Sequence, residues 1–381
     1  MRCPMSGTLP FAVVPDPRAI DPCLVDDLER AGAQVSEAVP LAGLTTLRVG
    51  GPARVLAECP TTASLIEVVR LLDTAAIPVL LLAGGSNVLI SDDGFDGVVV
   101  HIGSNTIRID DSIVTADAGA EWDTVVAQSI DAGLGGLECL SGIPGSAGAT
   151  PVQNVGAYGV EIASLLRSVE LLDRATGEVR HTEPAELGLA YRTSVLKHSD
   201  RAVVLSAEFE LQRGGSSAPL RYGELARVLG ASDGESRPAA QVREAVLGLR
   251  RGKGMVLDRA DNDTWSAGSF FTNPVVSGEQ LPAVLAKIVA RVGDVTIPQF
   301  PAPDGTKLSA GWLIERAGFE KGFPGIDAPA RLSTKHTLAL TNRGSARASD
   351  IVALARSVRD GVATAFGVLL EPEPVPVGLA L

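Results

Sequence analysis

The chain has 381 residues, 45% of them hydrophobic, which is too long for one hydrophobic core and predicts two or three folded domains. Acidic residues outnumber basic ones by 45 to 33, and no block of lysine or arginine stands out, so nucleic acid and anionic membranes are excluded as expected partners. The four cysteines have no paired spacing, which argues against a metal site or a disulfide framework and favours a reduced, cytoplasmic protein.

Residues 1–40 are expected to form an irregular extension, because five prolines fall within the first 22 residues. One helix is possible over residues 24–31. The prolines also interrupt the apolar stretch that a signal peptide needs. No run elsewhere approaches the roughly 20 apolar residues of a membrane span, so membrane insertion is not expected.

A pattern of strands and helices begins near residue 41. A strand over residues 53–57 precedes a helix that has Thr61 or Thr62 as its N-cap and a single apolar face. A short strand over 79–82 then runs into the turn Gly84-Gly-Ser-Asn87. A Rossmann fingerprint or a P-loop requires a helix after such glycines. Residues 88–90 are β-like instead, so both nucleotide motifs are disfavoured.

The middle of the chain predicts a helix followed by antiparallel strands. The helix covers residues 121–132, with Gly133 placed to stop it. Alternating apolar and polar residues then predict strands over 168–173, 178–181 and 202–212.

A third unit is predicted to open with a helix over residues 239–249. Further helices are predicted over residues 281–292, 308–317 and 349–366. Ser349 is the expected N-cap of the last helix and Gly367 its stop. A strand is predicted over 337–340. Three prolines stiffen the extended segment 368–376.

Three loops rich in Gly, Ser, Thr and Asn could together hold one long dinucleotide. They are Thr45–Gly51, Gly84–Asn87 and Ser141–Gly159. The third loop has five glycines, a composition that lets the main chain approach a ligand and offer N–H groups to phosphate. The alternative is that all three are ordinary turns.

In their order and residue sequence, these loops resemble those of the UDP-N-acetylenolpyruvoylglucosamine reductase family, which are flavoenzymes of bacterial cell-wall precursor synthesis. The resemblance spans residues 41–378 and continues through six further short motifs. These are Tyr191–Ser194, Leu220–Leu225, Arg250–Lys253, Ala267–Pro274, Leu308–Ile314 and Leu370–Glu373. Each motif is weak alone, but the full set in the family's order is specific. Tyr222 resembles the mobile tyrosine of the type I subclass.

The resemblance implies an α+β fold, with a two-lobed FAD-binding domain of the vanillyl-alcohol-oxidase type and a separate α+β substrate-binding domain. The expected FAD-binding lobes cover residues 41–111 and 112–240, and the substrate-binding domain covers 241–365. Residues 366–381 are expected to form a C-terminal strand that returns to the active site. The extension over 1–40 has no counterpart in the shared motifs.

The activity implied by the resemblance is an NADPH-dependent, FAD-containing oxidoreductase of peptidoglycan synthesis. It would reduce the enolpyruvyl ether of UDP-N-acetylglucosamine to the lactyl ether of UDP-N-acetylmuramate, a step that serves cell wall biogenesis, cell shape and cell division. Its partners would be the UDP-sugar and NADPH, with no obligatory protein partner. Two alternatives stay open: another FAD-dependent sugar or alcohol oxidoreductase of the same fold, and a nucleotide-binding scaffold without catalysis.

Hydride addition to an enol ether next to a carboxylate requires a cation and a proton donor. By resemblance, Arg192 is the cation, Ser269 the proton donor and Glu373 the group that orients or polarises the enolic intermediate. A planar guanidinium can hold a carboxylate bidentately. Glu371 has the same proline-rich surroundings as Glu373, and period-two alternation would send both side chains to one face. The pattern therefore does not separate these two glutamates.

The resemblance also implies two sets of binding residues. The FAD-binding set comes from the three loops: Thr46, Gly84, Gly85, Ser86, Asn87, Ser141, Gly142, Pro144, Gly145, Gly148, Ala149, Gln153, Asn154, Gly156, Ala157, Tyr158 and Gly159. The substrate-binding set is Tyr191, Tyr222, Arg250, Lys253 and Asn273. For Arg250 and Lys253 the alternative is a basic helix end that the helix dipole favours.

Overall fold

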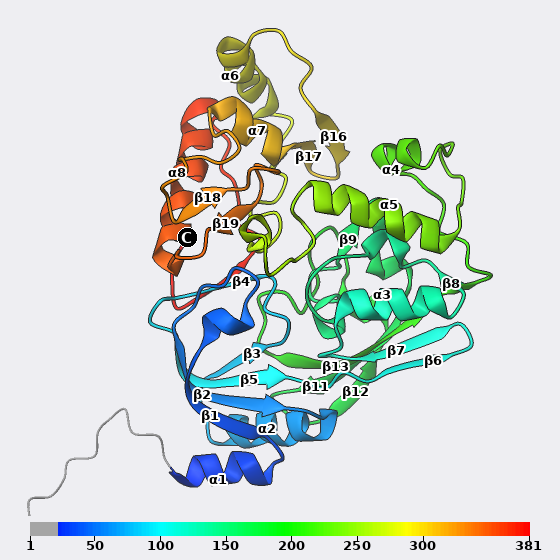
Figure 1. Ribbon diagram of the computed structural model, residues 1–381, viewed down its shortest axis with the longest axis vertical. Coiled ribbons are helices and arrows are strands. Elements are labelled where there is room, and N and C mark those ends of the chain that lie inside the picture. Colours follow the sequence, from blue (N-terminus) through cyan, green and yellow to red (C-terminus); the bar gives the residue numbers. More distant parts are fainter. Residues whose placement is uncertain (1–21) are drawn as a thin grey trace, which may run out of the picture.

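Residues 22–381 are described by a computed structural model, and they form three units that pack on one another (Figure 1). The first unit is a four-stranded sheet. In sheet order its strands are β1 (Gln34–Pro40), β2 (Pro52–Cys59), β5 (Phe95–Ile102) and β3 (Val79–Leu82). The strands β2, β5 and β3 are parallel, whereas β1 pairs antiparallel with β2 at the edge. Helix α2 (Thr62–Thr74) links β2 to β3 and buries its apolar face.

The predicted strands and helix of this first unit are confirmed. Thr61 is the N-cap of α2: its hydroxyl accepts a hydrogen bond from the Ser64 N–H at 3.1 Å, and the Thr61 N–H donates to the Ser64 hydroxyl at 3.2 Å. The predicted helix over 24–31 is present as α1 (Pro22–Arg30). The expectation of irregular structure up to residue 40 is wrong for residues 34–40, which form β1 by pairing with β2. Residues 1–21 of the predicted extension lie outside the described residues.

The second unit is a five-stranded antiparallel sheet covered by helices. In sheet order its strands are β12 (Val179–Thr182), β11 (Leu166–Asp173), β13 (Ala202–Glu210), β7 (Ile113–Asp117) and β6 (Ile107–Asp110). Two short pairs accompany it, β8 (Leu134–Gly135) with β14 (Gln212–Arg213) and β9 (Gly156–Ala157) with β10 (Val160–Glu161). Its helices are α3 (Trp122–Asp131), α4 (Gly223–Val228) and α5 (Ala239–Gly252). Figure 1 shows α3 and α5 stacked over the same side of the sheet.

Helix α5 packs in this second unit, not in the third unit that it was predicted to open. Val242 and Val246 lie one helical turn apart and are fully buried in the same core as Trp122 and Phe209. The Trp122 and Phe209 rings have their centroids 5.4 Å apart. The apolar stripe of α5 therefore faces the second sheet. The predicted domain boundary at residue 241 does not match this packing, because the third core contains no part of α5.

The third unit contains helices α6 (Leu281–Val292), α7 (Ala310–Ala317) and α8 (Ala348–Phe366). Two small sheets join them, β15 (Val275–Val276) with β17 (Gly305–Leu308) and β16 (Gln299–Ala302), and β18 (Ala330–Leu332) with β19 (Leu340–Asn342). The strand predicted over 337–340 is wrong, because the Ala339 N–H donates to the His336 carbonyl in a turn and the strand begins only at Leu340. Within residues 22–381 no helix has both the length and the apolarity to cross a bilayer.

Strand pairing and a shared core both join the third unit to the first. Strand β20 (Val375–Val377) pairs in parallel with β4 (Val88–Ile90), so the chain returns to the first unit after α8. The core of the third unit also includes Leu47, Val49 and Leu89, which belong to segments of the first unit.

Helix α8 begins at Ala348, one residue before the predicted N-cap Ser349, and part of its cap comes from another unit. The Asp92 carboxylate accepts the Ala348 N–H at 2.7 Å and the Ser349 N–H at 3.1 Å. Partial burial would raise the pKa of Asp92, but these two N–H bonds, the Ser349 hydroxyl and the charge of Arg347 together hold it below its usual value. Asp92, a residue of the first unit, therefore caps α8, the longest helix of the third unit.

We expect Asp92→Ala to lower the free energy of unfolding at pH 7 by about 1 kcal/mol, the usual cost of a lost helix cap. Because the folded-state pKa of Asp92 is depressed, its stabilisation is present above the unfolded-state pKa of about 3.9 and is lost as the pH falls through the folded-state value. Urea unfolding at a series of pH values from 7 to 3 should show the difference from the parent shrinking at the acidic end. Asp93→Ala is the matched control, since Asp93 is exposed; equal losses in both variants would contradict the prediction.

Candidate active site

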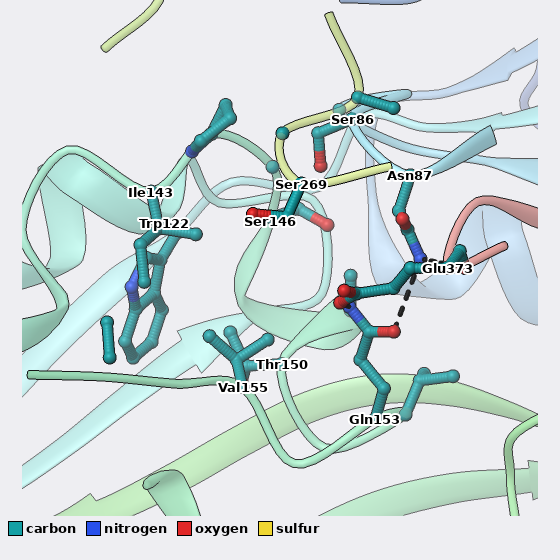
Figure 2. Close-up of a pocket in the computed structure, with 18 of the residues that line it drawn as sticks. Ser86, Asn87, Trp122, Ile143, Ser146, Thr150, Gln153, Val155, Ser269 and Glu373 are labelled. Carbon is teal, nitrogen blue, oxygen red and sulfur yellow. Dashed lines mark hydrogen bonds between the residues drawn. The ribbon is translucent and has the colours of Figure 1, made fainter. Parts of the chain in front are cut away.

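A cavity of about 530 Å³ lies where the three units meet, within the size range of small-molecule sites. Its walls come from the two glycine-rich segments 81–88 and 143–158, from residues 192–198, from the end of α5, and from residues 267–269 and Glu373. Figure 2 shows Trp122 and Ile143 on one side of this space and Asn87, Gln153 and Glu373 on the other.

The glycine loops meet backbone against backbone. A Cβ atom placed on Gly84 would lie 2.7 Å from the Cα of Gly145, and one on Gly85 would lie 2.0 Å from the Leu44 carbonyl oxygen. Gly85 also has a positive φ of 55° and accepts the Thr46 N–H at its carbonyl oxygen, at 3.1 Å. Any larger residue at these two positions would push the loops apart. The structure therefore brings the three glycine-rich loops together at one edge of the cavity.

Two buried polar groups on the cavity wall fit a phosphate-containing cofactor. The Ser146 hydroxyl and the Arg250 Nε are buried and have no hydrogen-bond partner among the described residues. Buried polar groups are nearly always paired, and both can donate to an anion. Burial lowers the pKa of the Arg250 guanidinium, a cost that a bound anion would offset. Together with the glycine backbone, the Ser146 hydroxyl suits the diphosphate of FAD, and Arg250 suits a phosphate of a second ligand in the same cavity.

The predicted FAD-binding residues divide into three groups. Those that line the cavity are Gly84, Gly85, Ser86, Asn87, Pro144, Gly145, Ala149, Gln153, Gly156, Ala157 and Tyr158. Thr46 lines a small neighbouring cavity instead, together with Arg250, and its hydroxyl donates to the Ser266 carbonyl at 2.7 Å.

The remaining predicted FAD-binding residues, Ser141, Gly142, Gly148, Asn154 and Gly159, are not on the cavity wall. The Ser141 hydroxyl donates to the Glu138 carbonyl, and the Gly142 N–H donates to Asp123. The Asn154 amide bonds to Glu161 and to the Ala190 carbonyl. Gly148 packs against Ala118, where a Cβ would lie 2.5 Å from the Ala118 Cβ. Most of these residues therefore shape the loop that carries the lining residues.

Arg192 and Glu373 meet on the cavity wall from distant parts of the chain. The Arg192 Nε lies 3.5 Å from the Glu373 Oε1, and the Arg192 Nη2 donates to the Gly156 carbonyl at 2.8 Å. The Gln153 amide donates to the same Oε1 at 3.3 Å. Burial raises the pKa of Glu373, against the opposing effects of Arg192, Lys197 and Gln153. The side chain of Glu373 is only 14% exposed, so this carboxylate sits in a dry, positively charged setting.

The structure separates Glu373 from Glu371. Glu373 lines the cavity, whereas Glu371 is exposed and not on its wall. Residues 371–373 form one isolated bridge, from Phe271 to Pro372, and no continuous strand. Strand alternation therefore does not apply here, and the two glutamates do not share a face. Backbone bonds hold Glu373 in place: its N–H donates to the Phe270 carbonyl at 2.9 Å, and its own carbonyl accepts the Asn87 amide at 3.3 Å.

Ser269 also lines the cavity, on the loop that precedes Phe270 and Phe271. Both phenylalanines are buried, with ring centroids 5.2 Å apart, and they anchor this loop in the core of the third unit. Gly268, just before the serine, has a φ of 73°. Ser269 thus lines the same cavity as Arg192 and Glu373, and Figure 2 shows Ser269 and Glu373 beside this space.

Three of the five predicted substrate-binding residues line the cavity, and two do not. Tyr222, Arg250 and Lys253 are on the wall. The Tyr222 ring makes an edge contact with Tyr158 at 5.3 Å, and the Lys253 Nζ donates to Glu224 at 2.8 Å. Tyr191 is off the wall, with the Lys307 Nζ 4.4 Å from its ring centroid. Asn273 is also off the wall, because its amide oxygen accepts the Ala310 N–H at the start of α7.

Several lining residues were not predicted from the sequence, above all Lys197, His198, Trp122 and His336. The Lys197 Nζ donates to the Arg192 carbonyl at 2.8 Å. Its position five residues after a predicted catalytic arginine was a signal in the sequence that could have identified Lys197 as a site residue. Burial lowers the pKa of His336 to about 4, with help from Lys253 and Lys321. Four Lys or Arg residues line the cavity against one carboxylate, a positive site in a chain of net charge −12. Among residues 22–381 no group of three or more His, Cys, Asp or Glu side chains is placed to hold a metal ion.

Comparison with known proteins identifies both halves of this arrangement. The family model of the FAD binding domain matches residues 53–183, and that of the UDP-N-acetylenolpyruvoylglucosamine reductase C-terminal domain matches residues 259–377. These matches confirm the predicted fold class: a two-lobed FAD-binding domain of the vanillyl-alcohol-oxidase type with a separate α+β C-terminal domain.

Relatives match over nearly the full chain. The UDP-N-acetylenolpyruvoylglucosamine reductase of Nocardia farcinica is 71% identical over 354 residues, which is 93% of this chain and 92% of the relative. That of Mycobacterium marinum is 58% identical over 92% of this chain and 97% of the relative. The crystal structure of the reductase from Thermus caldophilus superposes with a TM-score of 0.63 at 26% identity, over 91% of this chain and 99% of that one. The chain therefore belongs to the UDP-N-acetylenolpyruvoylglucosamine reductase family.

Proposed function

We propose that this chain catalyses the NADPH-dependent reduction of UDP-N-acetylenolpyruvoylglucosamine to UDP-N-acetylmuramate, a step of peptidoglycan precursor synthesis. The observation that carries the proposal is the meeting of Arg192, Ser269 and Glu373 in one cation-rich cavity beside the glycine loops. The chemistry that bound FAD would supply is hydride transfer, with the hydride taken from NADPH and passed to the enolpyruvyl double bond. The loop Gly84–Asn87, together with Pro144, Gly145 and Ser146, would hold the cofactor.

Arg192 is the proposed cation for the substrate carboxylate and for the charge that develops next to it. Its side chain is 26% exposed, and one of its terminal nitrogens is already bound to the Gly156 carbonyl. That bond fixes the plane of the guanidinium, and a fixed donor pair stabilises charge in a water-poor site far better than a mobile one. The nearby Glu373 carboxylate balances Arg192 and orients or polarises the enolic intermediate.

Ser269 is the proposed proton donor to the carbon adjacent to the site of hydride addition. A serine hydroxyl is a weak acid, so it can serve only where the acceptor carbon is strongly basic and the geometry is fixed. The buried pair Phe270 and Phe271 supplies the fixed geometry.

Tyr222, Arg250 and Lys253 are proposed to bind the diphosphate of the UDP-sugar, and NADPH is proposed to use the same cavity before it. Tyr222 is 41% exposed and directly precedes α4, so its ring can close over a ligand. This placement supports assignment to the type I subclass with a mobile tyrosine loop. Tyr191 and Asn273 act behind the cavity wall in this proposal, by supporting Arg192 and by capping α7.

We further propose that residues 41–111 and 112–252 are the two FAD-binding lobes, that the third unit binds the substrate, and that residues 366–381 bring Glu373 back to the site. Helix α5 is assigned to the second lobe, since its buried face packs there. A cytoplasmic location is proposed as well, consistent with the unpaired, buried Cys59 and Cys139.

The purified protein should be yellow, and NADPH should bleach its flavin absorbance under anaerobic conditions. Addition of the enolpyruvyl UDP-sugar should then restore the absorbance without oxygen. A sugar or alcohol oxidoreductase of the same fold would be bleached by its own substrate and reoxidised by oxygen. A non-catalytic scaffold would be colourless or inert to NADPH. Either of these results would refute the proposed function.

Ser269→Ala should separate the two half-reactions. We expect flavin reduction by NADPH to stay near the parent rate, while reoxidation by the UDP-sugar slows about 10²-fold, the scale of lost general acid catalysis. Stopped-flow absorbance under anaerobic conditions measures both steps. Reoxidation at the parent rate would remove Ser269 from the proton-donor role.

Glu373→Gln and Glu371→Gln form a matched pair that differs in access to the cavity. We expect Glu373→Gln to slow the UDP-sugar half-reaction at least about 10-fold, because the charged group that orients Arg192 and the enolic intermediate is lost. Glu371→Gln should leave this rate within about two-fold of the parent, since that carboxylate is exposed and off the wall. Single-turnover kinetics decides, and similar effects in both variants would contradict the assignment.

A further inference from the structure

Arg192 sits at the tip of a tight turn with an unfavourable backbone conformation. Ala190 and Thr193 exchange two backbone hydrogen bonds, at 3.1 and 3.2 Å, which makes Tyr191 and Arg192 the two residues of the tip. Arg192 has a φ of 54°, in the left-handed region that turns usually fill with Gly or Asn. A non-glycine residue keeps such a conformation only where its surroundings hold it there.

Three side chains hold this turn. The Asn154 amide donates to the Ala190 carbonyl at 3.1 Å, and the Ser194 hydroxyl donates to the Val152 carbonyl at 2.6 Å. These two bonds fix the flanks of the turn against the glycine-rich loop. The third is the Lys197 Nζ, which donates to the carbonyl of Arg192 itself at 2.8 Å. Lys197 therefore acts directly on the residue whose side chain must be aimed.

The same ammonium group faces the catalytic cavity. The charged and titratable lining groups, apart from its tyrosines, are Arg192, Lys197, His198, Arg250, Lys253, His336 and Glu373. Of these, Arg192 and Lys197 act on Glu373 and oppose the rise in its pKa that burial causes. A lysine ammonium has three donors, so one bond to the Arg192 carbonyl leaves its charge available to the cavity.

We propose that Lys197 is a positioning residue for the reduction, which fixes Arg192 through its backbone carbonyl and places a second positive charge beside Glu373. The inference rests on the proposed function and adds to it a residue outside the three catalytic ones. Lys197 contacts neither reacting carbon in this scheme, so its effect on the reaction passes through Arg192 and Glu373.

The test compares Lys197→Met with the conservative Lys197→Arg in the full chain with bound FAD. We expect Lys197→Met to slow the UDP-sugar half-reaction about 10- to 100-fold, the scale of a misplaced catalytic group. In the pH profile of the parent rate, the limb that belongs to Glu373 is the one that disappears in Glu373→Gln. This limb should move to higher pH in Lys197→Met, because the loss of a nearby positive charge favours the protonated carboxyl. Lys197→Arg, which keeps both donor and charge, should restore most of the rate and leave the limb in place.

Lys287→Met is the charge-matched control, since Lys287 is an exposed residue of α6 and lies off the cavity wall. Its rate and pH profile should equal those of the parent. A Lys197→Met rate within two-fold of the parent, or an unmoved limb, would overturn the proposal. If Lys197→Met does not retain flavin, Lys197→Gln is measured in its place, with the same expected result. A parent enzyme that fails the anaerobic bleaching and recovery cycle would refute the proposed function itself, a separate outcome.

Discussion

The site depends on a backbone contact between glycine loops that leaves no room for side chains. Gly84 faces the Cα of Gly145, and Gly85 faces the Leu44 carbonyl, at separations that any Cβ would violate. This contact brings the first unit against the loop of the second unit that carries the cavity wall. Ser146 and Gln153 follow on that same loop. A methyl group at Gly84 would therefore displace this part of the cavity wall together with Gln153, the partner of Glu373.

Local patterns in the sequence predicted much of the fold, whereas the three proposed catalytic residues came from the family resemblance. The capping box at Thr61, the stop at Gly133 and the limits of α6 follow from side-chain chemistry within one or two turns. The family resemblance implied the roles of Arg192, Ser269 and Glu373, and the structure places these three residues on one cavity wall.

What the sequence did not predict was decided by contacts between distant segments. Helix α8 starts at Ala348, and Asp92, more than 250 residues earlier, supplies part of its cap. The side chains of Glu371 and Glu373 do not follow strand alternation, because a single bridge to Phe271 replaces a regular strand. The apolar face of α5 was recognisable from its spacing, but the surface that it covers was not. In each case local chemistry offered a group, and its partner came from a distant segment of the chain.

The return of the chain through β20 has a consequence for the order in which the enzyme is built. Glu373 and Val375 follow every other residue of the cavity wall along the chain. Glu373 reaches its place through bonds to Phe270 and Asn87 and through the pairing of β20 with β4. During synthesis from the N-terminus, domains fold in turn, and the glycine loops and Arg192 emerge from the ribosome well before this carboxylate. A nascent chain can thus assemble the part of the cavity wall that the glycine loops form before Glu373 is added to it.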